Sequence, residues 1–146
     1  MFDSALLAKL FPDGRYHPAQ HLVTWHPTGA LDNDCADRVV DFLESQEQIE
    51  GATFHRFTDM TGHTRIQIGL DHIVRLARRR RQSYAGPPVK SAFFAMRLIS
   101  VNVAHMYAEL MAGSNLQVCV FRDRAAAADW LGVPETVLLR PIQAAV

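Results

Sequence analysis

Residues 89–132 read VKSAFFAM (89–96), LISVNVAHMYAELMAG (98–113), LQVCVF (116–121) and RDRAAAADWLG (122–132). Apolar side chains occupy both odd and even positions of the first and third segments, which is the pattern of a strand buried on both faces. The second and fourth segments have the length and apolar spacing of helices. A strand that is apolar on both faces is typical of a parallel sheet covered by helices on each side. We therefore expect 89–96 and 116–121 to be adjacent, buried, central strands.

The first half of the chain repeats this alternation of strand and helix. HLVTWH (21–26) and ATFHRFT (52–58) predict two further strands. A helix follows the first of them, with an Asp or Asn among residues 32–34 as its N-cap, and another helix is predicted from about Thr64. Connections between parallel strands are almost always right-handed crossovers. The sequence therefore predicts an α/β fold with a mostly parallel (mixed) sheet of four to five strands flanked by helices.

The length and composition fit a single domain. The chain has 146 residues, of which 49% are hydrophobic and 21% charged, and this is ordinary for a domain with a core of its own. We expect the domain to span 21–133. Residues 1–20 would form an N-terminal extension or edge element, and 134–146 would form a C-terminal tail.

The charge and the apolar runs argue against several classes of protein. The formal net charge is +0, so no overall basic field favours nucleic acid as a partner. No segment has the length of a membrane span, and the apolar run near the start is too short for a signal peptide. Cys35 and Cys119 lie outside any CxxC pattern and are expected to be separate free thiols. These features predict a cytoplasmic protein.

Thr61, Gly62 and Thr64 stand where the second strand is expected to turn into its helix. If the helix starts at Thr64, the three residues lie at its N-terminus, where free N–H groups and the helix dipole favour an anion. They are therefore a candidate switch or anion site. Threonine is also an ordinary helix cap, and we favour capping as the simpler interpretation.

Four consecutive arginines, Arg78, Arg79, Arg80 and Arg81, end the same predicted helix. They could form an interaction patch for an acidic partner, an anionic lipid or nucleic acid. The alternative, which we favour, is a solvated helix end whose cations complement the negative pole of the dipole. Consecutive residues point in different directions around a helix, so the four arginines cannot all line one groove.

No motif for catalysis, metal binding or cofactor binding stands out. The chain has seven histidines, but none has HExxH spacing and no Cys–His cluster accompanies them. The phosphate-binding patterns GxGxxG and GxxxxGK[ST] are missing as well. We therefore predict no catalytic residue, no metal and no cofactor.

Three segments carry a resemblance to a known family: TGALD (28–32), FTDMTG (57–62) and MYAELMAGSNLQVCVFRDRAAAADWLG (106–132). The last has a closing pattern of helix, extended strand ending in Val-Phe-Arg-Asp, and Ala-rich helix ending in Trp-Leu-Gly. These segments resemble the STAS-type domains, the fold of anti-sigma-factor antagonists and of the cytoplasmic tails of sulfate transporters. Within that group the chain is similar to the SpoIIAA-like (STAS/SEC14-type) small bacterial proteins, over about residues 21–133.

The resemblance implies a mixed sheet flanked by helices, with no chemistry of its own. STAS antagonists are switched by phosphorylation of a Ser or Thr at the start of the helix after the central strand, and Thr61 stands in the nearest matching place. The sequence there, Asp-Met-Thr-Gly at 59–62, departs from the usual Asp-Ser-Ser-Gly, which leaves the acceptor role of Thr61 open. The SpoIIAA-like small proteins usually lack that switch.

Two functions from different classes follow. The first is a non-enzymatic regulatory or protein-interaction module that docks a protein partner or a second copy of itself as a homodimer. The second is a small-molecule or lipid-binding domain with an apolar pocket between sheet and helices, near Phe93, Met96, Met106 and Trp130. A closed core with a flat exposed helix face would favour the first function. A well-formed apolar pocket with a few convergent polar groups would favour the second.

Overall fold

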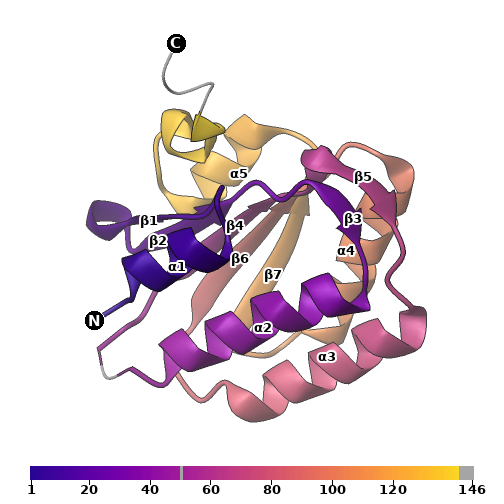
Figure 1. Cartoon of the computed structure of the whole chain (residues 1–146), viewed down its shortest axis with the longest axis horizontal. Helices are drawn as coiled ribbons and strands as arrows, with labels where there is room; N and C mark the ends of the chain where they lie inside the picture. The colour runs from indigo at the N-terminus through magenta and orange to yellow at the C-terminus, as the bar shows by residue number, and fades with distance from the viewer. Residues whose placement is uncertain (50, 142–146) are drawn as a thin grey trace.

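A five-stranded sheet runs through the centre of the protein, whose computed structural model describes residues 1–49 and 51–141 (Figure 1). The strands of the sheet are β1 (Arg15–His17), β2 (Leu22–Trp25), β4 (His55–Asp59), β6 (Val89–Phe94) and β7 (Leu116–Phe121). The helices are α1 (Ser4–Leu10), α2 (Asn33–Glu47), α3 (Leu70–Ser83), α4 (Leu98–Leu110) and α5 (Arg124–Leu131). Two short strands, β3 (Gly29–Leu31) and β5 (His63–Ile66), pair with each other in a small second sheet.

The strand order of the main sheet is β1-β2-β4-β6-β7. β1 runs antiparallel to β2, and the three pairs from β2 to β7 are parallel. The prediction of an α/β fold with a mostly parallel, mixed sheet is confirmed. The predicted alternation of strand and helix accounts for the parallel part, because each crossover carries a helix.

Helices cover both faces of the sheet. On one face, Leu22, Phe57 and Ala92 pack against α5 and against Leu138 of the turn Glu135–Leu138. The opposite face is covered by α1, α2, α3 and α4, and Figure 1 shows α2 and α3 running side by side. The N-cap of α2 is Asp32, one of the three candidates at 32–34, and its side-chain oxygen accepts a hydrogen bond from the Cys35 N–H at 2.8 Å.

One of the two strands expected at the centre lies at the edge instead. β6 and β7 are adjacent and parallel as predicted, but β7 is the last strand in the order and pairs only with β6 in the described part of the chain. Its two faces are contacted by α4 on one side and by α5 on the other, but Leu116 is its one buried residue, so the prediction that this strand is buried is wrong for most of its length. An apolar pattern on both faces of a strand indicates that helices cover it above and below. It does not indicate whether a further strand lies beside it in the sheet.

The helix expected from about Thr64 was wrongly placed. His63–Ile66 is strand β5, which pairs in parallel with β3, and α3 begins only at Leu70. Ile66, Leu70 and Ile73 have helical spacing, but Leu70 is 64% exposed and takes no part in a continuous buried stripe. The residue before the helix, Gly69, donates its N–H to the side-chain oxygen of Asn33 at 3.0 Å.

The ends of the described chain pack onto the core. β1 is the edge strand beside β2, and Phe2 and Leu7 are buried in a cluster with Val23 and Trp25. Near the other end, Leu138 is fully buried against the α5 face of the sheet. The last part of the expected tail, 142–146, lies outside the described residues. Cys35 and Cys119 are not joined, as predicted.

Candidate functional site

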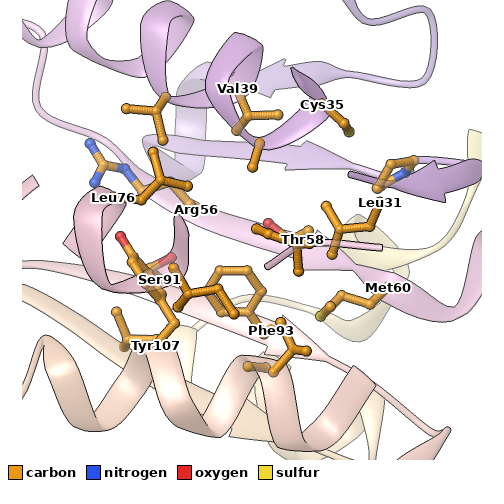
Figure 2. Close-up of a pocket in the computed structure, with 18 of the residues that line it drawn as sticks. Leu31, Cys35, Val39, Arg56, Thr58, Met60, Leu76, Ser91, Phe93 and Tyr107 are labelled. Atoms are coloured by element: carbon orange, nitrogen blue, oxygen red, sulfur yellow. The ribbon is translucent and has the colours of Figure 1, made fainter. Parts of the chain in front are cut away.

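A largely apolar cavity of about 160 Å³ lies between the sheet and helices α2, α3 and α4 (Figure 2). Most of its walls are aliphatic or aromatic. They are formed by Leu31, Val39, Val40, Leu43, Met60, Ile68, Ile73, Leu76, Phe93, Val103, Ala104, Leu116 and Val118, among others. An apolar cavity of roughly 150 Å³ is large enough to hold a benzene-sized molecule. The space is therefore suited to a small ligand.

Polar side chains reach this cavity from two neighbouring strands. Arg56 and Thr58 alternate along β4, and alternate residues of a strand point to the same face. The parallel register pairs Arg56 with Ser91 and Thr58 with Phe93, so β6 presents Ser91 and Phe93 on that face. Figure 2 shows Arg56 near one end of the cavity and Met60 and Leu31 near the other.

Three of these polar groups have no hydrogen-bond partner among residues 1–49 and 51–141. They are the hydroxyls of Thr58 and Ser91 and the Nε–H of Arg56, and the Nε atom is buried. Buried polar groups in proteins are normally hydrogen-bonded, and an unmet donor is costly. Unmet donors that border an empty apolar space are a typical feature of a ligand site.

Arg56 belongs to a buried charge cluster at its end of the cavity. Its Nη2 donates to Oε2 of Glu47 at 2.6 Å, and Arg80 donates to both oxygens of the same carboxylate, at 2.8 and 2.6 Å. The side chains of Arg56, Glu47 and Arg80 are only 3%, 5% and 2% exposed. The Arg56 guanidinium also lies 4.4 Å from the ring centroid of Phe54. Burial lowers the pKa of Arg56, although the nearby Glu47 carboxylate opposes that effect.

The predicted patch Arg78–Arg81 is divided by the structure. Arg80 is buried on Glu47, and Arg79 is bound to Asp41 and Glu44 of α2. Arg81 donates to the carbonyl oxygens of Leu110 and Ala112. Only Arg78 and Arg81 are exposed. The favoured interpretation, a solvated helix end, fits Arg78 and Arg81 but is wrong for Arg80, because the helix turns its second and third arginines onto neighbouring elements.

Thr61 and Gly62 lie in the single 3-10 turn Met60–Gly62, and Thr64 lies in β5, so none is at the N-terminus of α3. Thr61 instead donates both its N–H and its hydroxyl to Oδ1 of Asp59, at 2.9 and 2.6 Å. A Cβ at Gly62 would lie 2.5 Å from the carbonyl oxygen of Pro27, so the turn has no room for a side chain there. Of the three predicted site residues, Thr61 and Gly62 therefore share one turn, and Thr61 is bound to a carboxylate of the protein.

The other oxygen of Asp59 is bound to His26, whose Nδ1 lies 2.9 Å away. Burial raises the pKa of Asp59, but the hydrogen bonds from His26 and Thr61 outweigh burial and lower it to about 2. His26 is 2% exposed, and its Nε2 has no partner among the described residues. This histidine is therefore enclosed and cannot reach a bound substrate in this conformation.

Comparisons with known proteins bear on the fold alone. No family model matches the chain, and no curated protein matches it. Among solved structures, the chain is similar to an uncharacterised protein of the DUF3478 family from Shewanella loihica PV-4, described as having a SpoIIAA-like fold. The two share 15% identity with a TM-score of 0.47, over 75% of this chain and 83% of that chain.

The predicted neighbourhood of the pocket was mostly wrong. Phe93 lines the cavity, but Met96 is 49% exposed at the surface. Trp130 packs on Phe121, with ring centroids 5.6 Å apart, among the residues of the α5 face. Met106 is not part of the cavity wall. Phe93 and Trp130 lie on opposite faces of the sheet, which sequence separation alone does not reveal.

The residues of this site that sequence reasoning missed are Arg56, Ser91 and Glu47. One signal was present in FHRFT (54–58), where an arginine follows a phenylalanine by two positions and so points to the same, buried face. A charged residue is almost never fully buried unless it is paired. An inward arginine in a strand therefore predicts a buried carboxylate or a ligand nearby.

Among the described residues, no group of three or more His, Cys, Asp or Glu could hold a metal ion. Within the same residues, no helix is both long enough and apolar enough to span a membrane.

Proposed function

We propose that this protein is a binding module that holds a small, mostly apolar molecule in the cavity between its sheet and helices α2, α3 and α4. The observation that carries the proposal is the cavity itself, about 160 Å³ in volume, with apolar walls and unmet polar groups on one side. The proposal assigns binding and not turnover, since the buried His26–Asp59 pair is enclosed.

The experiment that tests binding uses small apolar probes and a variant that fills the cavity. Cys35 lines the cavity from the first turn of α2 and is half-buried. Cys35→Trp would place a large ring in the space, and Cys35→Ala is the matched control that leaves it open. A ligand that binds only the folded state raises its stability by RT ln(1 + [L]/Kd).

We expect benzene, toluene or indole to raise the melting temperature of the native protein and of Cys35→Ala, and to have little effect on Cys35→Trp. Heteronuclear NMR with the same probes should shift signals from residues of the cavity wall, such as Val39 and Val103. If no probe of this size binds the native protein, the proposal fails.

A second candidate is a protein-interaction role, with a second copy of this chain as the partner. It is supported by three exposed apolar side chains around the start of α4: Met96, which precedes the helix, is 49% exposed, Leu98 70% and Ile99 47%. Analytical ultracentrifugation of Leu98→Asp should show a loss of dimer. Leu10→Asp, at an apolar position of α1 that is 51% exposed, is the matched control. A native protein that is monomeric at high concentration would contradict this candidate.

A further inference from the structure

Charged side chains alternate in a row that runs from the surface to the cavity. Asp41 and Glu44 flank Arg79, Glu44 and Glu47 flank Arg80, and the row ends at Arg56. The side chain of Asp41 is 66% exposed and that of Arg56 only 3%, so the row leads inward. Arg79 and Arg80 each lie between two carboxylates. Arg56 has one, and shares it with Arg80.

The contact between Arg56 and Glu47 is also incomplete in geometry. Both oxygens of Glu47 accept from Arg80, and Arg56 donates a single hydrogen bond to this carboxylate, at Oε2. A guanidinium can donate two parallel hydrogen bonds to a carboxylate, and such paired contacts are the stronger ones. Arg56 uses Nη2 on Glu47, and its Nε–H has no partner among the described residues.

We infer that the ligand of this cavity is a small carboxylic acid with an apolar body, whose carboxylate binds Arg56. The inference rests on the proposed binding function and names the class of its ligand. A carboxylate at this place would give Arg56 the second anion that Arg79 and Arg80 already have. A neutral ligand would leave the Nε–H of Arg56 without a charged acceptor, and a cation would face two buried guanidiniums.

Two hydroxyls complete the recognition of an anion. Ser91 stands opposite Arg56 in the strand register, and Thr58 follows Arg56 on the same face of β4. Neither hydroxyl has a hydrogen-bond partner among residues 1–49 and 51–141, so both can donate to a ligand oxygen. The apolar walls toward Leu31 and Met60 would then hold the body of the acid. The cavity volume limits that body to about the size of one ring or a short chain.

The test compares matched acids and neutral compounds on the full chain. Benzoate is measured against benzamide, and hexanoate against 1-hexanol, by isothermal titration calorimetry at neutral pH. Hydrogen bonds to charged groups are worth more than those between neutral groups, so we expect each acid to bind at least tenfold more tightly than its neutral partner.

Variants locate the anion. Arg56→Gln leaves Glu47 bound to Arg80 and should remove the preference for the acid, so that benzoate and benzamide bind alike. Arg78→Gln removes an equal charge from an exposed position of α3 and should change neither affinity. If Arg56→Gln fails to fold, Thr58→Val combined with Ser91→Ala serves instead. That double variant should weaken benzoate severalfold while benzamide changes less.

The outcomes separate this inference from the proposed function. If the acids and their neutral partners bind equally, or if Arg56→Gln keeps the preference for acids, the inference is overturned and the binding function stands. If neither class binds the native protein, the binding function itself fails. Tighter binding of acids that depends on Arg56 supports both.

Discussion

Nδ1 of His26, next to the end of β2, lies 2.9 Å from Oδ2 of Asp59, the last residue of β4, and both side chains are withdrawn from solvent. The same carboxylate accepts two hydrogen bonds from Thr61 on its other oxygen. One buried carboxylate therefore holds together the ends of two neighbouring strands and the turn that follows them. Its ionisation is coupled to folding, since all of these hydrogen bonds favour the charged form.

We predict that Asp59 contributes stability that is lost in acid. Its folded-state pKa is about 2, below the ordinary value of 3.8, so the unfolded state binds a proton more readily. The contribution is therefore fully present above about pH 4 and disappears as the pH falls toward 2. A shift of this size corresponds to about 2 kcal/mol. Urea unfolding measured from pH 5 to pH 2 should show the loss.

Asp59→Asn should be less stable than the native protein at pH 6 and should have a shallower dependence on pH below 4. Asp71→Asn, at an exposed position in the first turn of α3, is the control and should follow the native curve. Identical pH curves for the native protein and Asp59→Asn would show that the Asp59 carboxylate does not stabilise the fold.

A second prediction concerns the carboxylate between two arginines. Glu47→Gln would leave Arg56 and Arg80 buried without their shared anion, and breaking a buried ion pair from one side costs about 3–5 kcal/mol. Asp41→Asn removes a carboxylate that is 66% exposed, and its loss should cost less than about 1 kcal/mol. Chemical denaturation of both variants measures the difference. A cost below about 1 kcal/mol for Glu47→Gln would mean that water reaches the two guanidiniums.

The third prediction compares the stability lost by truncating a side chain on the packed face of the sheet with that lost on the face that borders the cavity. Phe57 is fully buried against α5, and Phe57→Ala should cost about 3–5 kcal/mol. Phe93 is half-buried and already borders the cavity, so Phe93→Ala should cost no more than about 3 kcal/mol. From the sequence alone, a cost of about 3–5 kcal/mol would be expected for Phe93→Ala as well, because the apolar pattern of the strand predicts packing on both faces. Equal losses in denaturant unfolding would argue that the space beside Phe93 is closed in solution.

The parts of the fold that the sequence predicts are those where local pattern and tertiary contact agree. In β6, apolar residues on both faces meet helices on both faces, and strands and crossovers follow from that alternation. β7 shows the same pattern at the edge of the sheet, because helix cover and strand order are independent. Strand β5 was not predicted, because Ile66 and Leu70 have helical spacing although they lie in different elements.

The cavity could not be predicted from the sequence, because an empty space results from how helices and sheet are placed and leaves no mark on any one segment. The polar groups that line it are spread over β4, β6, α3 and α4, and Glu47, which binds Arg56, lies on α2. Only Arg56, the inward-pointing arginine of β4, could have been inferred from the sequence. The sequence of α3 shows four consecutive arginines but not which of them is buried. Arg80, the one that binds Glu47 beside the cavity, is buried in the core.

The last prediction concerns Thr61, which the sequence resemblance places nearest to a phosphorylated position. Its exposed side chain donates to Asp59 at 2.6 Å, so any added negative charge would meet a carboxylate that is already ionised. Thr61→Val should lose a hydrogen bond to a charged group, at a cost of about 1.5–3 kcal/mol. Thr61→Glu should be less stable still, because like charges repel and the second carboxylate raises the pKa of Asp59.

Thr64 provides the matched control, since its exposed side chain lies in β5 and has no side-chain partner among the described residues. Thr64→Val and Thr64→Glu should both stay within about 0.5 kcal/mol of the native protein. Thermal unfolding, with NMR titration of the Asp59 carboxyl, measures both effects. If Thr61→Glu is as stable as Thr61→Val, the turn accommodates an anion beside Asp59, and a charge-driven switch at Thr61 regains support. If it is less stable, an added charge at Thr61 acts by opening the turn that Asp59 holds closed.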